Sequence, residues 1–363
     1  MPFDIDRLLE AVLTNEASDL HLRVGLPPKI RLQGRMRTLG KVVLTDEDMQ
    51  SLMKSITSER NRQELDDKGS TDYGFAFRDQ TRFRASVFRH QTHIGMVFRM
   101  IPGTIRSMEE LDLPAVLKEL CMRPRGLFLV TGPTGSGKST TLAAMIDYIN
   151  ERRTDHIITI EDPIEFVHQP KNCVITQREV GVDTPSFSEA LRRALRQDPD
   201  IILVGEMRDL ETISSAITAS ETGHLVFGTL HTNGAQSTIN RIVDAFPTNQ
   251  QEQVRTQLAQ GLIGVVSQTL VPTKAGSRLA AFEVMINNHA IRAMIRKNET
   301  FKINSAIQTG ADQGMFTLDD SLFNLYQTGE VAFDELICRA CQPDELENKI
   351  RQYRKELEAQ RKG

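Results

Sequence analysis

The sequence predicts an α/β fold, in which a small α+β domain is followed by a larger domain built on a mainly parallel sheet. At 363 residues the chain exceeds the size of one ordinary core, which favours two domains. In the first hundred residues, helical and alternating apolar patterns are mixed. After about residue 111, short apolar strands alternate with helices, which is typical of a parallel sheet covered by helices.

The elements expected in the first domain follow from the spacing of apolar residues. Helical spacing predicts a helix around 5–12, and a capping box of Thr45 and Asp48 predicts the start of a second helix. Alternation predicts strands at 20–24, 30–32, 73–77, 83–87 and 94–100. The pair Pro102-Gly103 breaks this pattern.

We therefore expect a first domain at 1–102, a linker at 103–110 and a second domain at 111–363. In the second domain, strands are predicted at 127–130, 157–160, 201–204 and 225–230, and helices around 138–150, 187–197 and 209–220. A charged helix with an apolar stripe is predicted from Asp344 to the end.

The loop after the first of these strands matches the phosphate-loop pattern G-x-x-x-x-G-K-[ST], and it leads into a helix. Its glycines allow the backbone to curl so that N–H groups and the helix N-terminus face a polyphosphate. We expect Lys138 to reach the β- and γ-phosphates and the Ser139 hydroxyl to bind Mg²⁺. The predicted site comprises Gly132, Pro133, Thr134, Gly135, Ser136, Gly137, Lys138, Ser139 and Thr140. A glycine-rich turn that binds nothing is the disfavoured alternative.

Acidic residues follow two of the predicted strands, at the sheet edge where ligands collect. Glu206 comes directly after strand 201–204, and Glu161, Asp162 and Glu165 follow strand 157–160. An acid in such a place can hold Mg²⁺ or orient the attacking water. Glu206 is the first candidate for both roles, and Glu165 is the second. A solvated acid at a strand end is the alternative for each.

Two histidines flank the strand 225–230. Seven strand residues span about 23 Å, so His224 and His231 cannot touch the same phosphate if the strand is straight. His231, at the carboxyl end, is the better candidate for sensing the γ-phosphate. His224 is a candidate catalytic residue at the opposite edge, and a structural histidine is an equal alternative.

Three arginines of the first domain are also candidates. Arg82 and Arg84 share one face of a predicted strand, and Arg99 ends the next strand. Taken alone, they are typical solvent-facing arginines. In an oligomer, they could act as arginine fingers at a neighbour's nucleotide.

The composition indicates a soluble globular protein. The net charge of −4 and the lack of a clustered basic stripe argue against direct nucleic-acid binding and a DNA translocase. No apolar run approaches the ~18 residues of a membrane span, and no signal-peptide pattern is seen, so we expect a cytoplasmic protein. Cys338 and Cys341 form a lone C-x-x-C on a predicted helix at 331–341, where two buried small residues are favoured over a redox or metal pair.

Several motifs occur together in an order that resembles a known family. They are Gly-Pro-Thr-Gly-Ser-Gly-Lys-Ser-Thr at 132–140, Glu-Asp-Pro-Ile-Glu at 161–165, Val-Gly-Glu-Met-Arg-Asp-Leu-Glu-Thr at 204–212, Thr-Gly-His at 222–224 and Thr-Leu-His-Thr at 229–232. On these motifs the chain resembles the secretion ATPase superfamily, and specifically the type IV pilus retraction ATPases. The resemblance extends from Ser18-Asp19-Leu20-His21-Leu22 to the region around Asp334.

The resemblance implies a PAS-like N-terminal domain, a RecA-like P-loop ATPase domain and a ring-shaped homohexamer that uses ATP and Mg²⁺. It places the Walker A motif on 132–139, the Asp box on 161–165, the Walker B motif on 200–206 and the His box on 224–231. Family arginine fingers align best with Arg84 and Arg99, with Arg82 nearby. The implied partners are an inner-membrane platform protein and the pilin machinery, at the cytoplasmic face of the inner membrane at the pilus base.

Within the superfamily, the sequence favours pilus retraction over pilus assembly or type II secretion. Relatives with those other roles usually have an extra N-terminal domain and a four-cysteine metal motif, which the four cysteines here cannot form. One departure concerns the retraction motif Ala-Ile-Arg-Asn-Leu-Ile-Arg, which reads Ala-Ile-Arg-Ala-Met-Ile-Arg at 290–296. A nucleotide-gated regulator without hydrolysis is a further alternative, which the water-positioning acids disfavour.

Overall fold

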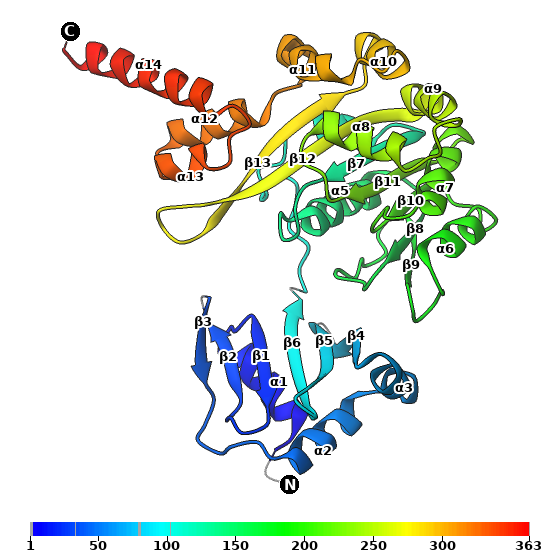
Figure 1. Ribbon diagram of the computed structural model, residues 1–363, viewed down its shortest axis with the longest axis vertical. Helices are drawn as coiled ribbons and strands as arrows, with labels where there is room; N and C mark the ends of the chain where they lie inside the picture. The colour runs from blue at the N-terminus through cyan, green and yellow to red at the C-terminus, as the bar shows by residue number, and fades with distance from the viewer. Residues whose placement is uncertain (1–2, 33, 79–80, 102, 363) are drawn as a thin grey trace. The chain divides into compact units, whose positions relative to one another are not determined.

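The computed structural model describes residues 3–32, 34–78, 81–101 and 103–362, and the chain divides into two units (Figure 1). The first unit contains residues 1–104 together with 163–167, and the second contains residues 105–162 and 168–363. The second unit therefore begins inside the segment predicted as a linker. Pro102, half of the predicted break, lies outside the described residues.

The first unit is built on a six-stranded antiparallel sheet with the order β3-β2-β1-β6-β5-β4. Its strands are β1 (Asp19–Arg23), β2 (Lys29–Leu32), β3 (Arg35–Thr38), β4 (Ser70–Phe77), β5 (Thr81–His90) and β6 (His93–Ile101). Its helices are α1 (Ile5–Thr14), α2 (Asp46–Ile56) and α3 (Glu59–Lys68). The predicted capping box is confirmed, because Asp48 N donates to Thr45 Oγ1 and Thr45 N donates to Asp48 Oδ2.

The two faces of this sheet differ in character. Phe83 of β5 and Phe98 of β6 point to the face that packs in one apolar cluster with α1 and α2, and both are fully buried. The intervening residues, among them Arg82 and Arg84, point to the other face. The alternation read from the sequence thus located five of the six strands, whereas β3 and helix α3 were not predicted.

The second unit is built on a seven-stranded sheet with the order β13-β12-β7-β11-β10-β8-β9. Its strands are β7 (Gly126–Thr131), β8 (His156–Glu161), β9 (Val174–Glu179), β10 (Ile201–Val204), β11 (Leu225–Leu230), β12 (Leu262–Pro272) and β13 (Arg278–Ile286). All neighbours are parallel except β12 and β13, which form an antiparallel hairpin. The four predicted strands form β7, β11, β10 and β8 at the centre of the sheet.

Helices surround this sheet, as the alternating pattern predicts (Figure 1). They are α4 (Val116–Cys121), α5 (Lys138–Arg152), α6 (Phe187–Ala194), α7 (Leu210–Glu221), α8 (Ala235–Asp244), α9 (Gln251–Gly261), α10 (His289–Arg296), α11 (Ile303–Thr309), α12 (Leu318–Thr328), α13 (Phe333–Ile337) and α14 (Pro343–Lys362). Two short 3₁₀ helices lie at η1 (Thr300–Lys302) and η2 (Ala311–Gln313). No helix of the described residues is long and apolar enough to cross a bilayer.

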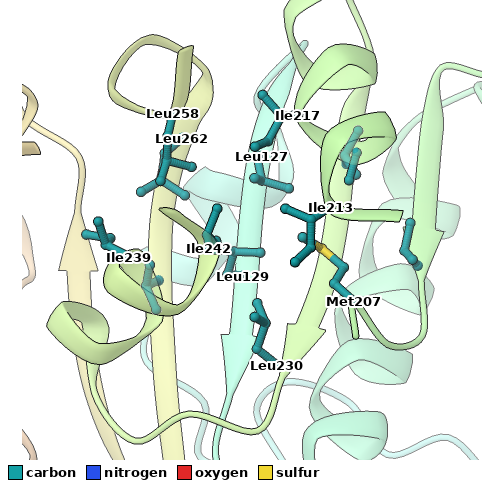
Figure 2. Close-up of a cluster of buried hydrophobic side chains, with 14 of the residues drawn as sticks. Leu127, Leu129, Met207, Ile213, Ile217, Leu230, Ile239, Ile242, Leu258 and Leu262 are labelled. Carbon is teal, nitrogen blue, oxygen red and sulfur yellow. The ribbon is translucent and has the colours of Figure 1, made fainter. Parts of the chain in front are cut away.

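Strand β7 has apolar cores on both of its faces. Leu127 and Leu129 point into a cluster with α7, α8 and α9, which Figure 2 shows. Phe128 and Val130 point into a second cluster with Leu142 and other residues of α5. Because β7 is buried along its whole length, the loop that follows it starts from a fixed position.

The prediction for Cys338 and Cys341 was wrong. Helix α13 ends at Ile337, and α14 begins at Pro343, so both cysteines lie on the connection between these helices and both are exposed. The apolar stripe of the charged C-terminal helix is confirmed in part, because Leu346 and Ile350 are buried against α12 and α13.

Candidate nucleotide site

The predicted phosphate loop connects β7 to α5, and its glycines adopt conformations that other residues avoid. Gly132 has φ 137°, Gly135 has φ 78° and Gly137 has φ 92°. A Cβ atom at Gly132 would lie 2.2 Å from the backbone oxygen of Gln268, so no larger residue fits there. The loop is therefore tightly curled over β12, as a phosphate cradle requires.

Two side chains of this loop are placed to serve a polyphosphate. Lys138 Nζ donates to the carbonyl oxygens of Gly132 and Pro133, at 2.9 and 3.1 Å, which keeps the ammonium group against the loop. Ser139, in the first turn of α5, is exposed. Its hydroxyl is thus available as a hard oxygen ligand, the type that Mg²⁺ prefers.

Glu206 lies just past the carboxyl end of β10, and only 17% of its side chain is exposed. His231 Nε2 lies 2.9 Å from Glu206 Oε1. Arg208 forms an ion pair with the same oxygen, and the hydrogen bond to Glu206 raises the pKa of Arg208. The sequence analysis did not select Arg208, although a basic residue two positions after Glu206 is close enough to form an ion pair with it.

His231 links Glu206 to the phosphate loop. Its Nδ1 lies 3.4 Å from Thr134 Oγ1, while its Nε2 faces the carboxylate. Because a carboxylate only accepts hydrogen bonds, the Nε2–H group donates to Glu206, while Nδ1 faces the Thr134 hydroxyl. The structure thus brings together three residues that were predicted from separate motifs.

The core anchors the backbone next to both Glu206 and His231. Met207 follows Glu206 and Leu230 precedes His231, and both are buried in the cluster of Figure 2. A Cβ atom at Gly228 would lie 2.3 Å from Met207 Sδ, so the missing side chain at this glycine makes room for Met207. The side chains of these two candidate residues therefore project from anchored backbone.

Two other predicted residues lie elsewhere in the structure. His224 is at the amino end of β11, where its Nδ1 lies 2.9 Å from the Ala219 carbonyl oxygen. The structure does not group His224 with His231, and its catalytic role stays a prediction. Glu165 is half-buried in the segment 163–167, and its role also stays a prediction.

Glu161 ends β8 and is engaged with its neighbours. Its Oε1 accepts hydrogen bonds from Thr159 Oγ1 at 2.7 Å and from Gln177 Nε2 at 3.1 Å. Among the described residues, no three His, Cys, Asp or Glu side chains form a metal-binding group. A divalent ion would therefore depend on phosphate oxygens together with Ser139 and Glu206, which are oxygen donors of the right kind.

The candidate arginines of the first unit lie on the face of its sheet opposite the apolar core. Arg84 of β5 is directly opposite Arg99 of β6, and Arg82 is two residues away on the same face. Arg99 Nε donates to Asp19 Oδ1 at 2.8 Å, although the Arg99 side chain is 70% exposed. Asp19 thus holds Arg99 in place beside Arg84, a contact that sequence reasoning did not anticipate.

Asp19 gives the first unit a pH-dependent stability. Burial alone would raise the pKa of its carboxyl, but hydrogen bonds from Arg99 and Ser18 outweigh burial and hold the pKa below its ordinary value of 3.8. The stabilisation is therefore present above the ordinary pKa and is lost as the pH falls through the lowered value.

We expect Asp19→Asn to lower the urea midpoint of unfolding near neutral pH, and the deficit relative to wild type to shrink toward pH about 3. Asp66→Asn is the matched control, because Asp66 pairs with Arg89 at an exposed site and should have little effect at any pH. A deficit for Asp19→Asn that stays constant over this range would contradict the assignment.

Comparison with known proteins agrees with this geometry. Residues 3–313 match the family described as type II/IV secretion system protein. A type IV pilus retraction ATPase, PilT, of Pseudomonas aeruginosa is 51% identical over 329 residues, which cover 91% of this chain and 96% of that protein. A twitching motility protein of Neisseria gonorrhoeae is 49% identical, covering 84% of this chain and 82% of that one.

A solved structure gives the same result. The crystal structure of the pilus retraction motor PilT with bound ADP has a TM-score of 0.89 and 47% identity, and the match covers 95% of this chain and 99% of that one. The match covers nearly the whole chain, and it therefore extends over both units.

Proposed function

Because the chain belongs to the type II/IV secretion system protein family, we propose that it is an ATPase motor that retracts type IV pili. The observation that carries this proposal is the continuous set of contacts from Thr134 of the phosphate loop through His231 to Glu206. A site that only binds nucleotide has no need of a carboxylate held beside its phosphate loop.

Each residue of the site has a role in hydrolysis. The curled loop binds the phosphates through its N–H groups. When nucleotide binds, the Lys138 side chain moves, and its ammonium group exchanges the loop carbonyl oxygens for the β- and γ-phosphates. Mg²⁺, held by Ser139 and by Glu206 directly or through water, would neutralise phosphate charge. Glu206 orients the attacking water, and His231 relays the presence of the γ-phosphate to Glu206 through Thr134.

The arginines complete the site from a second subunit. In a homohexamer, Arg84 or Arg99 of one subunit stabilises the charge that develops on a neighbour's phosphoryl group. The segment 103–110 acts as the hinge through which hydrolysis moves the first domain. The ring works at the pilus base on the cytoplasmic face of the inner membrane, where it engages a platform protein and releases pilin subunits.

Mixed rings test whether catalysis is shared between subunits. Arg84→Ala and Glu206→Ala should each be inactive alone, and their mixture should regain part of the ATPase rate, because some interfaces combine an intact arginine with an intact Glu206. Arg99→Ala should be tested in the same way. Phosphate release after subunit exchange measures the rate. The proposal that arginines act across subunits is refuted if neither mixture has an ATPase rate above the sum of the rates of its two variants.

The direction of the motor is tested in cells. A strain that lacks the protein should carry excess pili and fail to twitch if the motor retracts pili. Bald cells would instead indicate pilus assembly, and normal pili with a secretion defect would indicate type II secretion. Purified wild-type protein that binds ATP but releases no phosphate would indicate the nucleotide-gated regulator.

A further inference from the structure

Gln268 of β12 lies directly beneath the phosphate loop. Only 3% of the residue is exposed, and its Nε2 donates to the carbonyl oxygen of Ser136 at 2.7 Å. The loop is also packed closely on this residue, because a Cβ at Gly137 would lie 3.1 Å from the same Nε2. No motif of the sequence pointed to Gln268, and the hydrolysis scheme above does not use it.

This hydrogen bond fixes the orientation of one peptide group in the cradle. In a planar trans peptide, the C=O and the following N–H point in opposite directions. When Gln268 holds the Ser136 oxygen toward β12, the N–H of Gly137 points away from β12. We propose that Gln268 is a positioning residue that aims the Gly137 N–H at the bound phosphates, an inference that rests on the proposed nucleotide site.

The amide of Gln268 has one workable orientation. Its Oε1 is buried and has no partner among the described residues. The reverse orientation would set Oε1 against the Ser136 oxygen, which places two acceptors in contact and leaves a buried donor unpaired. Retaining an unpaired buried oxygen costs stability, which is consistent with a group kept for function.

The same strand pair also anchors the loop that carries His231. Ser267 Oγ, next to Gln268, accepts from Gly234 N at 2.9 Å. Glu283, opposite Ser267 on β13, accepts from Ala235 N at 2.7 Å, at the start of α8. The β12–β13 hairpin, the long pair of strands beside β7 in Figure 1, therefore contacts both the phosphate loop and the loop that carries His231.

The test is the affinity for ADP of Gln268→Met, which keeps the length of the side chain and removes the donor. We expect the Kd for ADP and the KM for ATP to rise about tenfold, with kcat changed less than about twofold, since the lost bond acts in binding. The matched control is Gln251→Met, because Gln251 Nε2 donates to the Phe246 carbonyl oxygen at 3.1 Å, outside the phosphate loop.

The control distinguishes a loss of loop positioning, which lowers ADP affinity, from a general loss of stability. Gln251 lies outside the phosphate loop, so only Gln268→Met should lose ADP affinity, and the melting temperature without nucleotide reports any loss of global stability in each variant. A Kd within about twofold of wild type for Gln268→Met overturns the inference. If this variant does not fold, Gln268→Asn, whose amide is one methylene too short to reach, should show the same loss. Wild-type protein that binds no ADP would overturn the proposed function instead.

Discussion

Replacing Lys138 with alanine should abolish ATP hydrolysis, with a fall in kcat/KM of at least about a thousandfold. The Lys138 ammonium group is held within reach of the loop by the carbonyl oxygens of Gly132 and Pro133. Its loss removes a positive charge from the place where the β- and γ-phosphates must sit. Steady-state phosphate release by the purified protein measures the effect.

Lys171→Ala is the matched control for this experiment. Lys171 forms ion pairs with Asp147 and Glu151 near the far end of the same helix, α5, so its removal deletes a lysine of the same unit without touching the loop. We expect near wild-type turnover from this control. A Lys138→Ala protein that keeps more than about a tenth of wild-type activity would contradict the assigned site.

Glu206→Gln should lower kcat at least about a hundredfold and leave the affinity for ADP within about threefold of wild type. Glutamine preserves the size of the side chain and still offers an oxygen to His231 Nε2, but it has no negative charge to orient or activate water. The effect should therefore appear in turnover and not in binding. Single-turnover hydrolysis and equilibrium ADP binding separate the two.

Two further variants make this result decisive. Glu211→Gln changes an exposed acid at the start of α7 and should leave turnover unchanged. Glu165→Gln tests the second candidate for the same role. If Glu206→Gln hydrolyses ATP normally while Glu165→Gln does not, the water-positioning role belongs to Glu165.

The sequence was most informative where chemistry is local. The loop 132–139 is a continuous segment, and its glycine spacing alone specifies the positive φ angles seen at Gly132 and Gly137. The strands 127–130 and 201–204 are short apolar runs because a parallel sheet is buried on both faces. An acid at the end of such a run, Glu206, could therefore be selected from the sequence as a candidate site residue.

The long-range contacts that support the candidate site residues could not be predicted from local patterns. Ser136 and Gln268 are 132 residues apart in the chain, and no local pattern relates a glutamine of β12 to a carbonyl oxygen of the loop. The pairing of Asp19 with Arg99 spans 80 residues and depends on the register between β1 and β6. Each is a long-range contact set by sheet order, which apolar periodicity does not encode.

By itself the sequence specified the glycine-rich loop and the central parallel strands, and it predicted Glu206 and His231 as candidate site residues, because each follows from spacing along a short stretch of chain. Tertiary structure alone decided that His231 connects Thr134 to Glu206, that His224 lies at the other end of β11, and that β12 supports the loop from beneath. These contacts are set by which strands lie side by side and in which register, and only the folded sheet fixes that order.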